Sequence, residues 1–260
     1  MNKIDVNTDT GESYGRWHLG DDRSLLTYVS SANIACGMHA GDPPGMDGVV
    51  AACVENGVAT GAHPGFPDLQ GFGRREMKMS PSEIEAFVMY QVGALRVFAE
   101  SRGAGLTHVK AHGSLYNMAS VDDGMALAIA RGVARCTRKG EHLVLVGLAG
   151  SRLLWAGEKT GLPVAAEGFC DRAYRSDGNL VPRGIAGAVV TDLESIAARA
   201  VGMVRDGYLT AIDGSRLALK VDTICIHSDT PGAAEIARAV NGALKASGIE
   251  ITSLHRVLGL

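Results

Sequence analysis

The chain of 260 residues lacks several features that mark common protein classes. It contains no apolar run of about 18 residues, the length that a membrane-spanning helix needs, and its first residues form no apolar signal region. Its 25 basic and 28 acidic residues are mixed along the chain, with a net charge of -3, so no basic stripe is available for a nucleic acid. We therefore expect a cytoplasmic protein with neither a membrane nor a nucleic acid as partner.

Cysteine is scarce, and several familiar motifs are absent. The five cysteines form no C-x-x-C pair, which argues against a zinc finger and against a disulfide framework. Cys36 stands among polar residues, but we interpret it as an inert buried thiol rather than a nucleophile. The chain has no G-x-x-x-x-G-K-[ST], no G-x-G-x-x-G after its first strand, no G-x-S-x-G and no H-E-x-x-H. These absences argue against a stand-alone P-loop NTPase, a dehydrogenase, a serine hydrolase and a zincin.

Short β-branched runs alternate with longer stretches of helical periodicity, which is typical of a parallel sheet. Seven strand-like runs begin near Ile4, Val29, Val58, Leu106, Leu143, Val164 and Ile224. Seven βα units favour a closed (β/α) barrel, with an open doubly wound sheet as the alternative. No repeat and no low-complexity linker interrupts the pattern, so we expect a single domain over residues 1–260.

Capping residues and prolines mark the beginnings of helices. Four predicted starts are Asp42-Pro43-Pro44, Ser80-Pro81-Ser82-Glu83, Thr191-Asp192-Leu193-Glu194 and Thr230-Pro231. The first helix should end at Gly57 and the second at Arg102-Gly103. Two further interruptions, Asp177-Gly178 and Asp213-Gly214, are two-residue turns that predict small β-hairpins.

Polar residues gather where the predicted strands end, the edge at which (β/α) barrels build their active sites. Asp5, Asn7 and Asp9 alternate on the first strand, so their side chains should share one face. Later strands end in further polar residues, namely Asn33, Cys36, His39, His63, His227 and Asp229. Histidines converging from separate strands favour a functional site. The alternative is a hydrogen-bonded plug at the barrel mouth.

The segment His108-Val109-Lys110-Ala111-His112 places a lysine in the predicted barrel. Alternation points His108, Lys110 and His112 to one side. A lysine inside a barrel needs an anion, which can be a structural carboxylate such as Glu167 or a bound carboxylate or phosphate. We favour the bound ligand, and we expect burial beside histidines to tune the lysine for acid–base work.

Two more groups of charged residues lie near predicted strand ends. Glu167 and Asp171 flank the end of the sixth strand, and Arg172 and Arg183 bracket the first hairpin. These groups can hold a substrate carboxylate, or they can pair with one another. The glycine-rich basic segment Gly71–Arg75 can offer backbone N–H groups and a guanidinium to an anion, or it can be a solvated turn.

Blocks of sequence along nearly the whole chain match the motifs of one known family. They are Asp5–Asn7 with Gly11–Ser13, Ser31–Gly37 with His39–Asp42, Gly61–Pro64 with Asp68–Arg75, and His108–Lys110 with His112-Gly113 and Leu115–Asn117. The later blocks are Glu167 with Asp171-Arg172, Tyr174, Asp177-Gly178, Leu180 and Arg183, and Ile226-His227 with Asp229 and Pro231-Gly232-Ala233. Through these blocks the chain resembles the LamB/YcsF proteins. It departs from them at Thr8 and Thr10, where cysteine and methionine are expected, and at Ala111, where proline is frequent.

The resemblance implies a seven-stranded TIM-like barrel of the glycoside hydrolase and deacetylase type, with small β-hairpin insertions. It also implies the activity of the A subunit of bacterial 5-oxoprolinase, which acts together with subunits B and C. In that reaction ATP, together with Mg, phosphorylates the lactam oxygen of 5-oxo-L-proline, and water then opens the ring to give L-glutamate, ADP and phosphate.

The family motifs also suggest roles for individual residues. Catalytic groups are expected at Asp9, His63, Lys110, His112, Glu167 and His227. Groups that bind the substrate or the nucleotide are expected at Asn7, Glu12, Asn33, His39, Asp42, Arg74, Asp171, Arg172, Arg183 and Asp229. In this hypothesis Lys110 and Arg74 neutralise phosphate or carboxylate, a histidine moves protons, and Asp9 or Glu167 orients water.

Two other functions stay open. A carbohydrate N-deacetylase would hold a divalent metal ion with Asp9, His39 and His63, although the two histidines lack the close helical spacing that those enzymes use. The ATP-dependent reaction needs no protein-bound metal of this kind. A scaffold or regulatory subunit, in contrast, would only bind its partner subunits.

Overall fold

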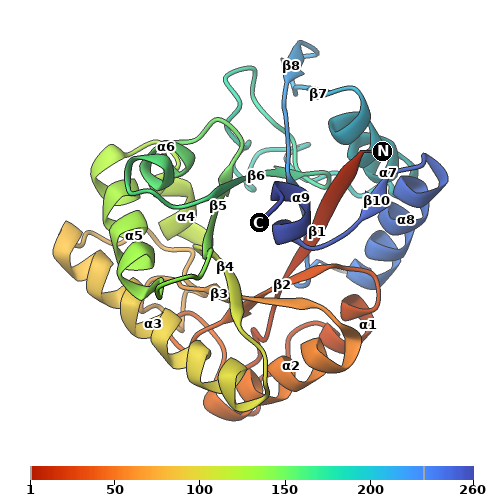
Figure 1. Cartoon of the computed structure of the whole chain (residues 1–260). Coiled ribbons are helices and arrows are strands. Elements are labelled where there is room, and N and C mark those ends of the chain that lie inside the picture. Colours follow the sequence, from red (N-terminus) through yellow and green to blue (C-terminus); the bar gives the residue numbers. More distant parts are fainter. Residues whose placement is uncertain (1, 231) are drawn as a thin grey trace.

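Parallel strands close into a seven-stranded barrel in the computed structural model, which describes residues 2–230 and 232–260 (Figure 1). The barrel strands are β1 (Lys3–Thr10), β2 (Ser31–Ala35), β3 (Ala59–His63), β4 (Leu106–Lys110), β5 (Val144–Leu148), β6 (Val164–Phe169) and β9 (Thr223–His227). Each strand pairs with the next along the chain from β1 to β6, and β9 pairs with both β6 and β1. The predicted strands and the closed barrel are therefore confirmed, and the open sheet is not formed.

Helices surround the barrel (Figure 1). They are α1 (Asp22–Leu26), α2 (Pro43–Asn56), α3 (Pro81–Ser101), α4 (Gly113–Ala119), α5 (Asp123–Cys136), α6 (Arg152–Lys159), α7 (Leu193–Arg205), α8 (Ala233–Ala246) and α9 (Leu254–Leu258). The short helix α9 covers the end at which the strands begin. Its Leu254 packs with Val144, Val146 and Ala165, and one ring nitrogen of His255 lies 2.8 Å from the carbonyl of His142, which precedes β5. The opposite end, where the strands finish, is left for a site.

Two helices begin and end where their capping residues predict. The side chain of Asp42 accepts a hydrogen bond from the backbone N–H of Gly45 at 2.8 Å, and α2 ends at Gly57 in the left-handed conformation (φ 67°). Ser80 and Glu83 form a reciprocal capping box at the start of α3, which ends at Ser101. Glycine suits the left-handed position because it has no Cβ to clash with the preceding turn.

Two predicted helix starts are wrong by one to three residues. Helix α7 is capped by Asp192, whose carboxylate accepts from the N–H of Ser195 at 2.8 Å, so the helix does not begin with a box at Thr191. Helix α8 begins at Ala233 rather than at Thr230, because a turn follows β9 and Gly232 (φ 78°) precedes the helix. Pro231, which belongs to that predicted start, lies outside the described residues.

Both predicted hairpin turns are present. Strands β7 (Tyr208–Thr210) and β8 (Arg216–Ala218) pair antiparallel around Asp213-Gly214, and they project from the barrel in Figure 1. Around Asp177-Gly178 the pairing is a single antiparallel bridge between Tyr174 and Leu180. These insertions lie between β6 and β9 in the sequence.

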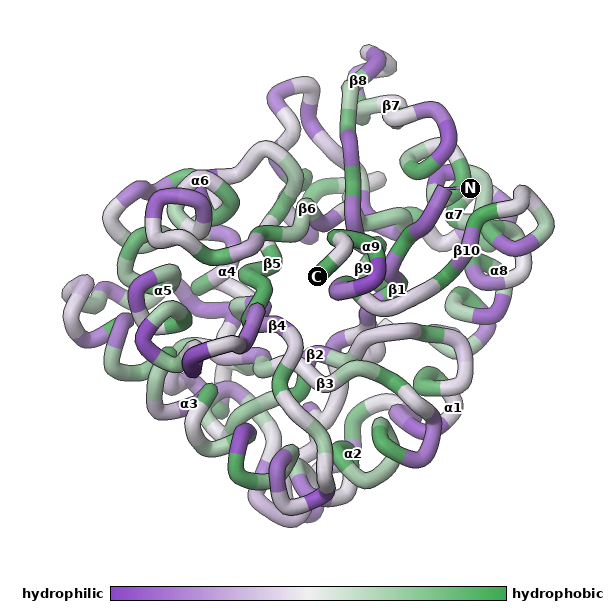
Figure 2. The backbone as a smooth tube through the Cα atoms, in the orientation of Figure 1, coloured by the Kyte–Doolittle hydropathy of each residue, from purple (hydrophilic) through white to green (hydrophobic). Residues whose placement is uncertain are grey.

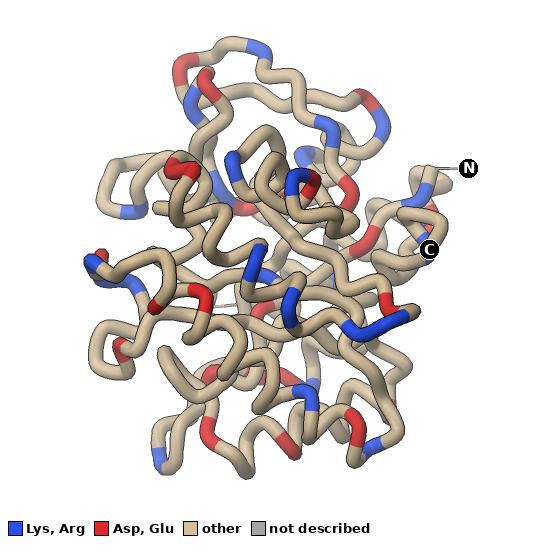
Figure 3. The backbone as a smooth tube through the Cα atoms, turned by 60° about the vertical axis from the view of Figure 1, so that its left-hand side comes forward, with Lys and Arg blue, Asp and Glu red and all other residues tan. Residues whose placement is uncertain are grey.

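The strands present two different faces. Val6, Ile34 and Val109 contribute to the apolar core between the sheet and the helices, whereas their neighbours Asn7 and Lys110 form polar contacts inside the barrel. Figure 2 shows hydrophobic stretches along the strands and hydrophilic ones on the surrounding helices. In Figure 3, acidic and basic residues are interspersed. No helix within residues 2–230 and 232–260 is long and apolar enough to cross a membrane.

Candidate active site at the carboxyl ends of the strands

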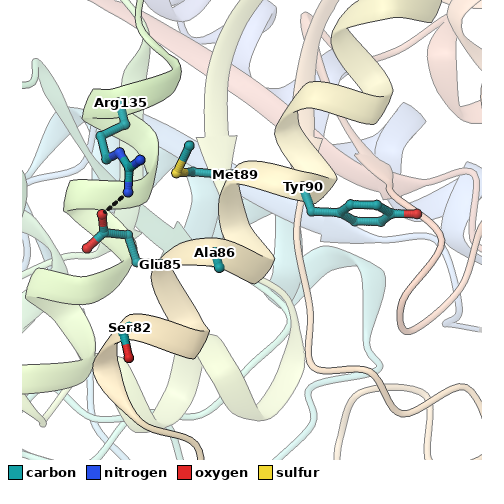
Figure 4. A pocket seen from close by; sticks show the side chains of 6 residues that line it. All are labelled: Ser82, Glu85, Ala86, Met89, Tyr90 and Arg135. Carbon is teal, nitrogen blue, oxygen red and sulfur yellow. Dashed lines mark hydrogen bonds and ion pairs between the residues drawn. The ribbon is translucent and has the colours of Figure 1, made fainter.

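A cavity of about 690 Å³ opens at the end of the barrel where the strands finish. The predicted residues that line it are Asp9, Glu12, His63, Arg74, Lys110, His112, Arg172, Arg183, His227 and Asp229. A second hollow of about 510 Å³ lies on the outer surface of α3 and α5 (Figure 4), where Glu85 and Arg135 form an ion pair. The larger cavity is the candidate site, because charged and titratable side chains from several strands converge in it.

Lys110 is the central cation of the cavity. Its Nζ atom lies 2.8 Å from Oδ1 of Asp9 and 2.8 Å from Oε1 of Glu167, and its side chain is 3% exposed. Burial alone would lower the pKa of Lys110, but Asp9 and Glu167 outweigh burial and raise this pKa well above its usual value. Lys110 therefore remains charged. The shift is opposite in direction to the predicted tuning toward acid–base work, and Glu167, the structural carboxylate that we considered as an alternative, is one of the two counter-ions.

Asp9 connects the lysine to the histidines. Its Oδ1 atom accepts from Lys110 and from Asn33, while Oδ2 lies 3.5 Å from Nε2 of His63. Burial alone would raise the pKa of the Asp9 carboxyl, but His63 and Lys110 outweigh burial and hold that pKa well below its usual range. Asp9 is therefore an anion that can orient a polar group in the cavity.

Asn7 and Asn33 form a layer beneath the cavity. Nδ2 of Asn7 donates to Glu167 at 3.0 Å and to Thr223 at 2.7 Å, and Nδ2 of Asn33 donates to Asn7 at 2.7 Å. Neither asparagine lines the cavity. The structure places both as supports for the carboxylates, not at the surface where we expected them to bind a ligand. Deeper still, Asp5 accepts from Ser31 and Thr223, so this layer matches the plug alternative.

His108 fills the barrel below this layer. Its Nε2 atom lies 2.8 Å from Oδ1 of Asn33, and burial lowers the pKa of His108 to about 3, so the ring is neutral. The neighbouring strand β3 makes room for it: a Cβ atom at Gly61 would lie 2.2 Å from Nε2 of His108. His108 is therefore a structural histidine held by a glycine that faces it.

The other histidines form a cluster with Glu12 beside the lysine. His39 and His112 stack with parallel rings, with centroids 3.7 Å apart, and His63 meets both edge-on. Burial lowers the pKa of His39 and of His112 well below the usual value, whereas burial together with the charge of Asp9 raises the pKa of Glu12. His39 lies behind the others and does not line the cavity.

These contacts change the predicted metal ligands. We expected Asp9, His39 and His63 to hold a metal ion if one is bound. The ligand atoms that lie within 4.8 Å of one another instead belong to Glu12, His39, His63 and His112. A second group of this kind joins Asp9 to Cys225 and His227. Asp9 does not belong to the first group, and its Oδ1 atom pairs with Lys110 at 2.8 Å.

The opposite wall carries His227 and two arginines. Nδ1 of His227 lies 2.9 Å from Asp171, and Phe169 stacks on the ring of His227. Arg172 donates to the carbonyl of Val181 at 2.6 Å, so it holds the hairpin segment rather than pairing with a carboxylate. Burial, together with Arg183, lowers the pKa of Arg172. Two guanidiniums on one wall suit an anion.

The glycine-rich loop does not offer free N–H groups to an anion. The backbone N–H groups of residues 71–74 all donate within the loop, to Asp68, Leu69 and Gly71. Of the two alternatives for this segment, the structure therefore supports the turn, which satisfies its own donors. Only the guanidinium of Arg74 reaches the cavity, where its Nη2 atom lies 2.5 Å from Oδ2 of Asp229.

Asp42 is also placed away from the cavity. Besides capping α2, its carboxylate accepts from the N–H of Gly15 at 2.8 Å. Both carboxylate oxygens of Asp42 therefore accept structural hydrogen bonds. We expected Asp42 to bind the substrate or the nucleotide, but it does not line the cavity. Burial raises the pKa of Cys36 to about 12, which agrees with an inert thiol.

Tyr116 is a cavity residue to which we assigned no role. Its hydroxyl donates to Oε2 of Glu167 at 2.6 Å, and burial raises the pKa of Tyr116, so it keeps its proton. Tyr116 belongs to the block Leu115–Asn117, but its position on the short helix α4 was not predicted. Phe169 and Cys225 also touch the lysine, at 5.4 Å from the ring centroid and 3.1 Å from the sulfur.

Comparisons with known proteins identify the family. The LamB/YcsF family model matches residues 4–259. The chain is 51% identical over 249 residues to the A subunit of 5-oxoprolinase from Heliobacterium modesticaldum, with 96% of this chain and 97% of that protein covered. It is 47% identical over 257 residues to the A subunit of 5-oxoprolinase from Pyrococcus abyssi, with 99% and 100% covered. The crystal structure of the lactam utilization protein from Thermus thermophilus matches with a TM-score of 0.90 and 47% identity, covering 96% of this chain and 99% of that chain. The chain therefore belongs to the LamB/YcsF family.

Proposed function

We propose that this chain is the A subunit of an ATP-dependent 5-oxoprolinase, which opens 5-oxo-L-proline to L-glutamate in the cytoplasm together with subunits B and C. The observation that carries the proposal is the buried Lys110, held between Asp9 and Glu167 at a cavity of about 690 Å³. The choice of substrate rests on relatives that are about 50% identical over nearly the whole chain and are named A subunits of 5-oxoprolinase.

The chemistry must overcome the resonance stability of the lactam. The γ-phosphoryl group of ATP transfers to the lactam oxygen, which makes the ring carbon electrophilic and releases ADP. Water adds to that carbon, the C–N bond breaks, and the nitrogen takes a proton to become the amine of glutamate. A second water then displaces phosphate from the acyl phosphate. Two water molecules and one ATP are consumed for each glutamate.

The central residues supply charge and orientation in this scheme. Lys110 stays a cation and stabilises negative charge that develops on oxygen atoms above it. Asp9 accepts from Lys110 through one oxygen, and its other oxygen faces the cavity near His63, so it can orient the attacking water. His227 can exchange a proton with that water, since it lines the cavity with Asp9 and its ring is oriented by the contact of Nδ1 with Asp171. Tyr116 keeps Glu167 in place beside the lysine.

The outer cavity is suited to anions. Arg74, Arg172 and Arg183 line it, and guanidiniums bind carboxylates and phosphates with paired donors. We assign to them the carboxylate of 5-oxoproline and the phosphates of ATP, which arrives with Mg. Because the chain carries no P-loop and the 71–74 loop engages its own N–H groups, we propose that subunits B and C complete the nucleotide site.

The test is glutamate release from 5-oxoproline by the chain co-purified with its B and C subunits. We expect release that requires ATP, and a loss of at least a hundredfold in kcat for Lys110→Ala and for Asp9→Asn. Lys159→Ala, which removes an exposed lysine on α6, is the matched control and should keep full activity. Co-purification of the three subunits and circular dichroism show whether each variant is folded.

Two results would contradict the proposal. A folded native complex that releases no glutamate with ATP would exclude the reaction. Full activity of a folded Lys110→Ala complex would leave the chain as a scaffold for its partners.

A further inference from the structure

Unpartnered polar atoms lie in the cluster of Glu12 and histidines beside the cavity. Among the described residues, Oε1 of Glu12 and both ring nitrogens of His39 are buried without a hydrogen-bond partner. Oε1 of Glu12 and Nε2 of His39 face each other at 3.4 Å. Buried polar groups in native proteins are almost always satisfied, because an unpaired one loses its contact with water and gains nothing. Two such atoms facing each other, Oε1 of Glu12 and Nε2 of His39, indicate a missing partner between them.

The neighbouring histidines direct further lone pairs to the same point. Nδ1 of His63 lies 2.7 Å from the carbonyl of Lys110, and Nε2 of His112 lies 2.8 Å from the carbonyl of Phe72. A carbonyl can only accept, so Nδ1 of His63 and Nε2 of His112 each carry a hydrogen, and a neutral ring then has its lone pair on the other nitrogen. Nε2 of His63 and Nδ1 of His112 are then left with lone pairs, although they lie 3.0 Å apart.

The acceptors converge with the spacing of a metal site. Oε1 of Glu12 lies 3.3 Å from Nδ1 of His112 and 3.4 Å from Nε2 of His39. Ligands placed at about 2.0–2.1 Å from a tetrahedral zinc ion are about 3.3 Å from one another. A proton on Glu12 would satisfy one of these contacts and leave the other nitrogens facing each other. A cation satisfies all of them.

We infer that Glu12, His39, His63 and His112 form a binding site for one divalent transition-metal ion of the zinc type. Three imidazoles and one carboxylate are ligands that such an ion prefers. The carbonyls of Lys110 and Phe72 supply the outer hydrogen bonds that fix the ring orientation of metal-binding histidines.

Two glycines make room for the rings of this cluster. A Cβ atom at Gly65 would lie 2.6 Å from Nδ1 of His39, and one at Gly73 would lie 2.8 Å from Cδ2 of His112. Any other residue at these positions would push an imidazole out of place. The backbone around the cluster is therefore shaped for imidazoles.

One ring has to move when the ion binds. An ion lies in the plane of each imidazole that holds it, and the rings of His39 and His112 are stacked with an angle of 3° between their planes. They cannot both point at one ion in this arrangement. We expect Glu12, His63 and His112 to bind the ion first, and the ring of His39 to turn and complete the set.

Metal binding is separable from the proposed reaction, since the chain alone can be tested without 5-oxoproline, ATP or partner subunits. The chelator-treated native chain is titrated with Zn²⁺ by calorimetry, and with Co²⁺ while the visible absorption of the bound ion is followed. We expect one ion per chain, with the intense bands of a four-coordinate Co²⁺ site, and a rise in the melting temperature when Zn²⁺ is added.

The matched variants are Glu12→Gln and His112→Asn, compared with His18→Asn at an exposed position. We expect the first two to weaken Zn²⁺ binding by at least tenfold and His18→Asn to leave it unchanged. Absence of stoichiometric binding by the folded native chain would overturn the site, and a proton shared within the cluster would then remain. Equal affinity in a folded Glu12→Gln variant would overturn the assignment of the ligands.

Discussion

The hydroxyl of Tyr116 donates a hydrogen bond of 2.6 Å to Oε2 of Glu167, the carboxylate whose other oxygen holds Lys110. Tyr116→Phe removes this hydrogen bond and leaves a buried charged oxygen unsatisfied. Hydrogen bonds to charged groups contribute about 1.5–3 kcal/mol, so the variant should lose that much free energy of unfolding.

Urea denaturation of the isolated chain measures this loss. Tyr90→Phe is the control, since the side chain of Tyr90 is 64% exposed on α3, and its effect should stay within about 0.5 kcal/mol. Equal stability of the native chain and Tyr116→Phe would show that this contact does not hold Glu167.

Lys110 is expected to stabilise the fold as well as the reaction. Lys110→Met removes the cation and leaves Asp9 and Glu167 buried as uncompensated charges. Removing one partner of a buried ion pair costs about 3–5 kcal/mol, so urea denaturation at neutral pH should show a loss of that order.

A second substitution tests the cause of that loss. Adding Glu167→Gln to Lys110→Met removes one of the stranded charges, so the double variant should regain at least about 1 kcal/mol over the single variant. No recovery would mean that lost packing around the lysine, and not charge, dominates.

Local sequence signals were enough to place the elements that close the barrel. Asp42 and Ser80 cap helices through contacts with residues three positions away. The alternation of Asp5, Asn7 and Asp9 needs only the period of a strand to predict a shared polar face. These features depend on neighbours within one turn or one strand, and they were confirmed.

The partners across the barrel could not be predicted in this way. Tyr116 and Glu167 are 51 residues apart, and Asn7 and Thr223 are 216 apart, so their contacts depend on the register with which the strands close. The same is true of Asp9, which pairs with Lys110 and leaves Glu12 to meet His39. The sequence also could not decide between an anion site and a turn for residues 71–74, because glycine content does not show which N–H groups a turn satisfies.

Gly61 should be irreplaceable because it faces His108. In Gly61→Ala the new methyl group would lie 2.2–2.4 Å from the imidazole of His108. The imidazole cannot move aside, because the barrel around it is packed. Overpacking of a core usually costs about 1–3 kcal/mol, and we expect at least the upper end of that range in urea denaturation.

A helical glycine gives the matched control. Gly93 lies within α3, and a Cβ atom there would meet no atom within 4 Å. Gly93→Ala should therefore stabilise the chain by about 0.5–1 kcal/mol, because alanine favours the helix. Similar effects of the two substitutions would contradict the contact between Gly61 and His108.

Substitutions of Arg183 and Arg172, the two arginines of the cavity wall, should have different effects on activity and stability. Arg183 lines the cavity, so Arg183→Ala should raise the KM for the lactam substrate or for ATP by about tenfold, the equivalent of about 1.4 kcal/mol, with little change in stability. Arg172 also holds the carbonyl of Val181, so Arg172→Ala should lower both activity and the melting temperature. Steady-state kinetics of the three-subunit complex and thermal melting of the chain make the comparison. An Arg183→Ala enzyme with unchanged KM values would remove this arginine from the anion site.

Asp5 should make the chain less stable as the pH rises. Burial raises its pKa from 3.8 to about 6, although Ser31 and Thr223 donate hydrogen bonds to it. The folded state therefore binds a proton more tightly than the unfolded chain does. The stability contributed by this proton is fully present below the unfolded pKa and is lost as the pH rises through about 6. The difference corresponds to about 3 kcal/mol.

Asp5→Asn carries a neutral group of the same shape at every pH, so it isolates this effect. Compared with the native chain, the variant should gain stability between about pH 4 and pH 7, by up to about 3 kcal/mol, and the difference should then stay constant. Urea denaturation of both proteins at each pH measures it. The other titrating groups are present in both proteins, so their contributions cancel in the difference between the two free energies of unfolding. If this difference did not change with pH, Asp5 would be ionised in the folded barrel throughout this range.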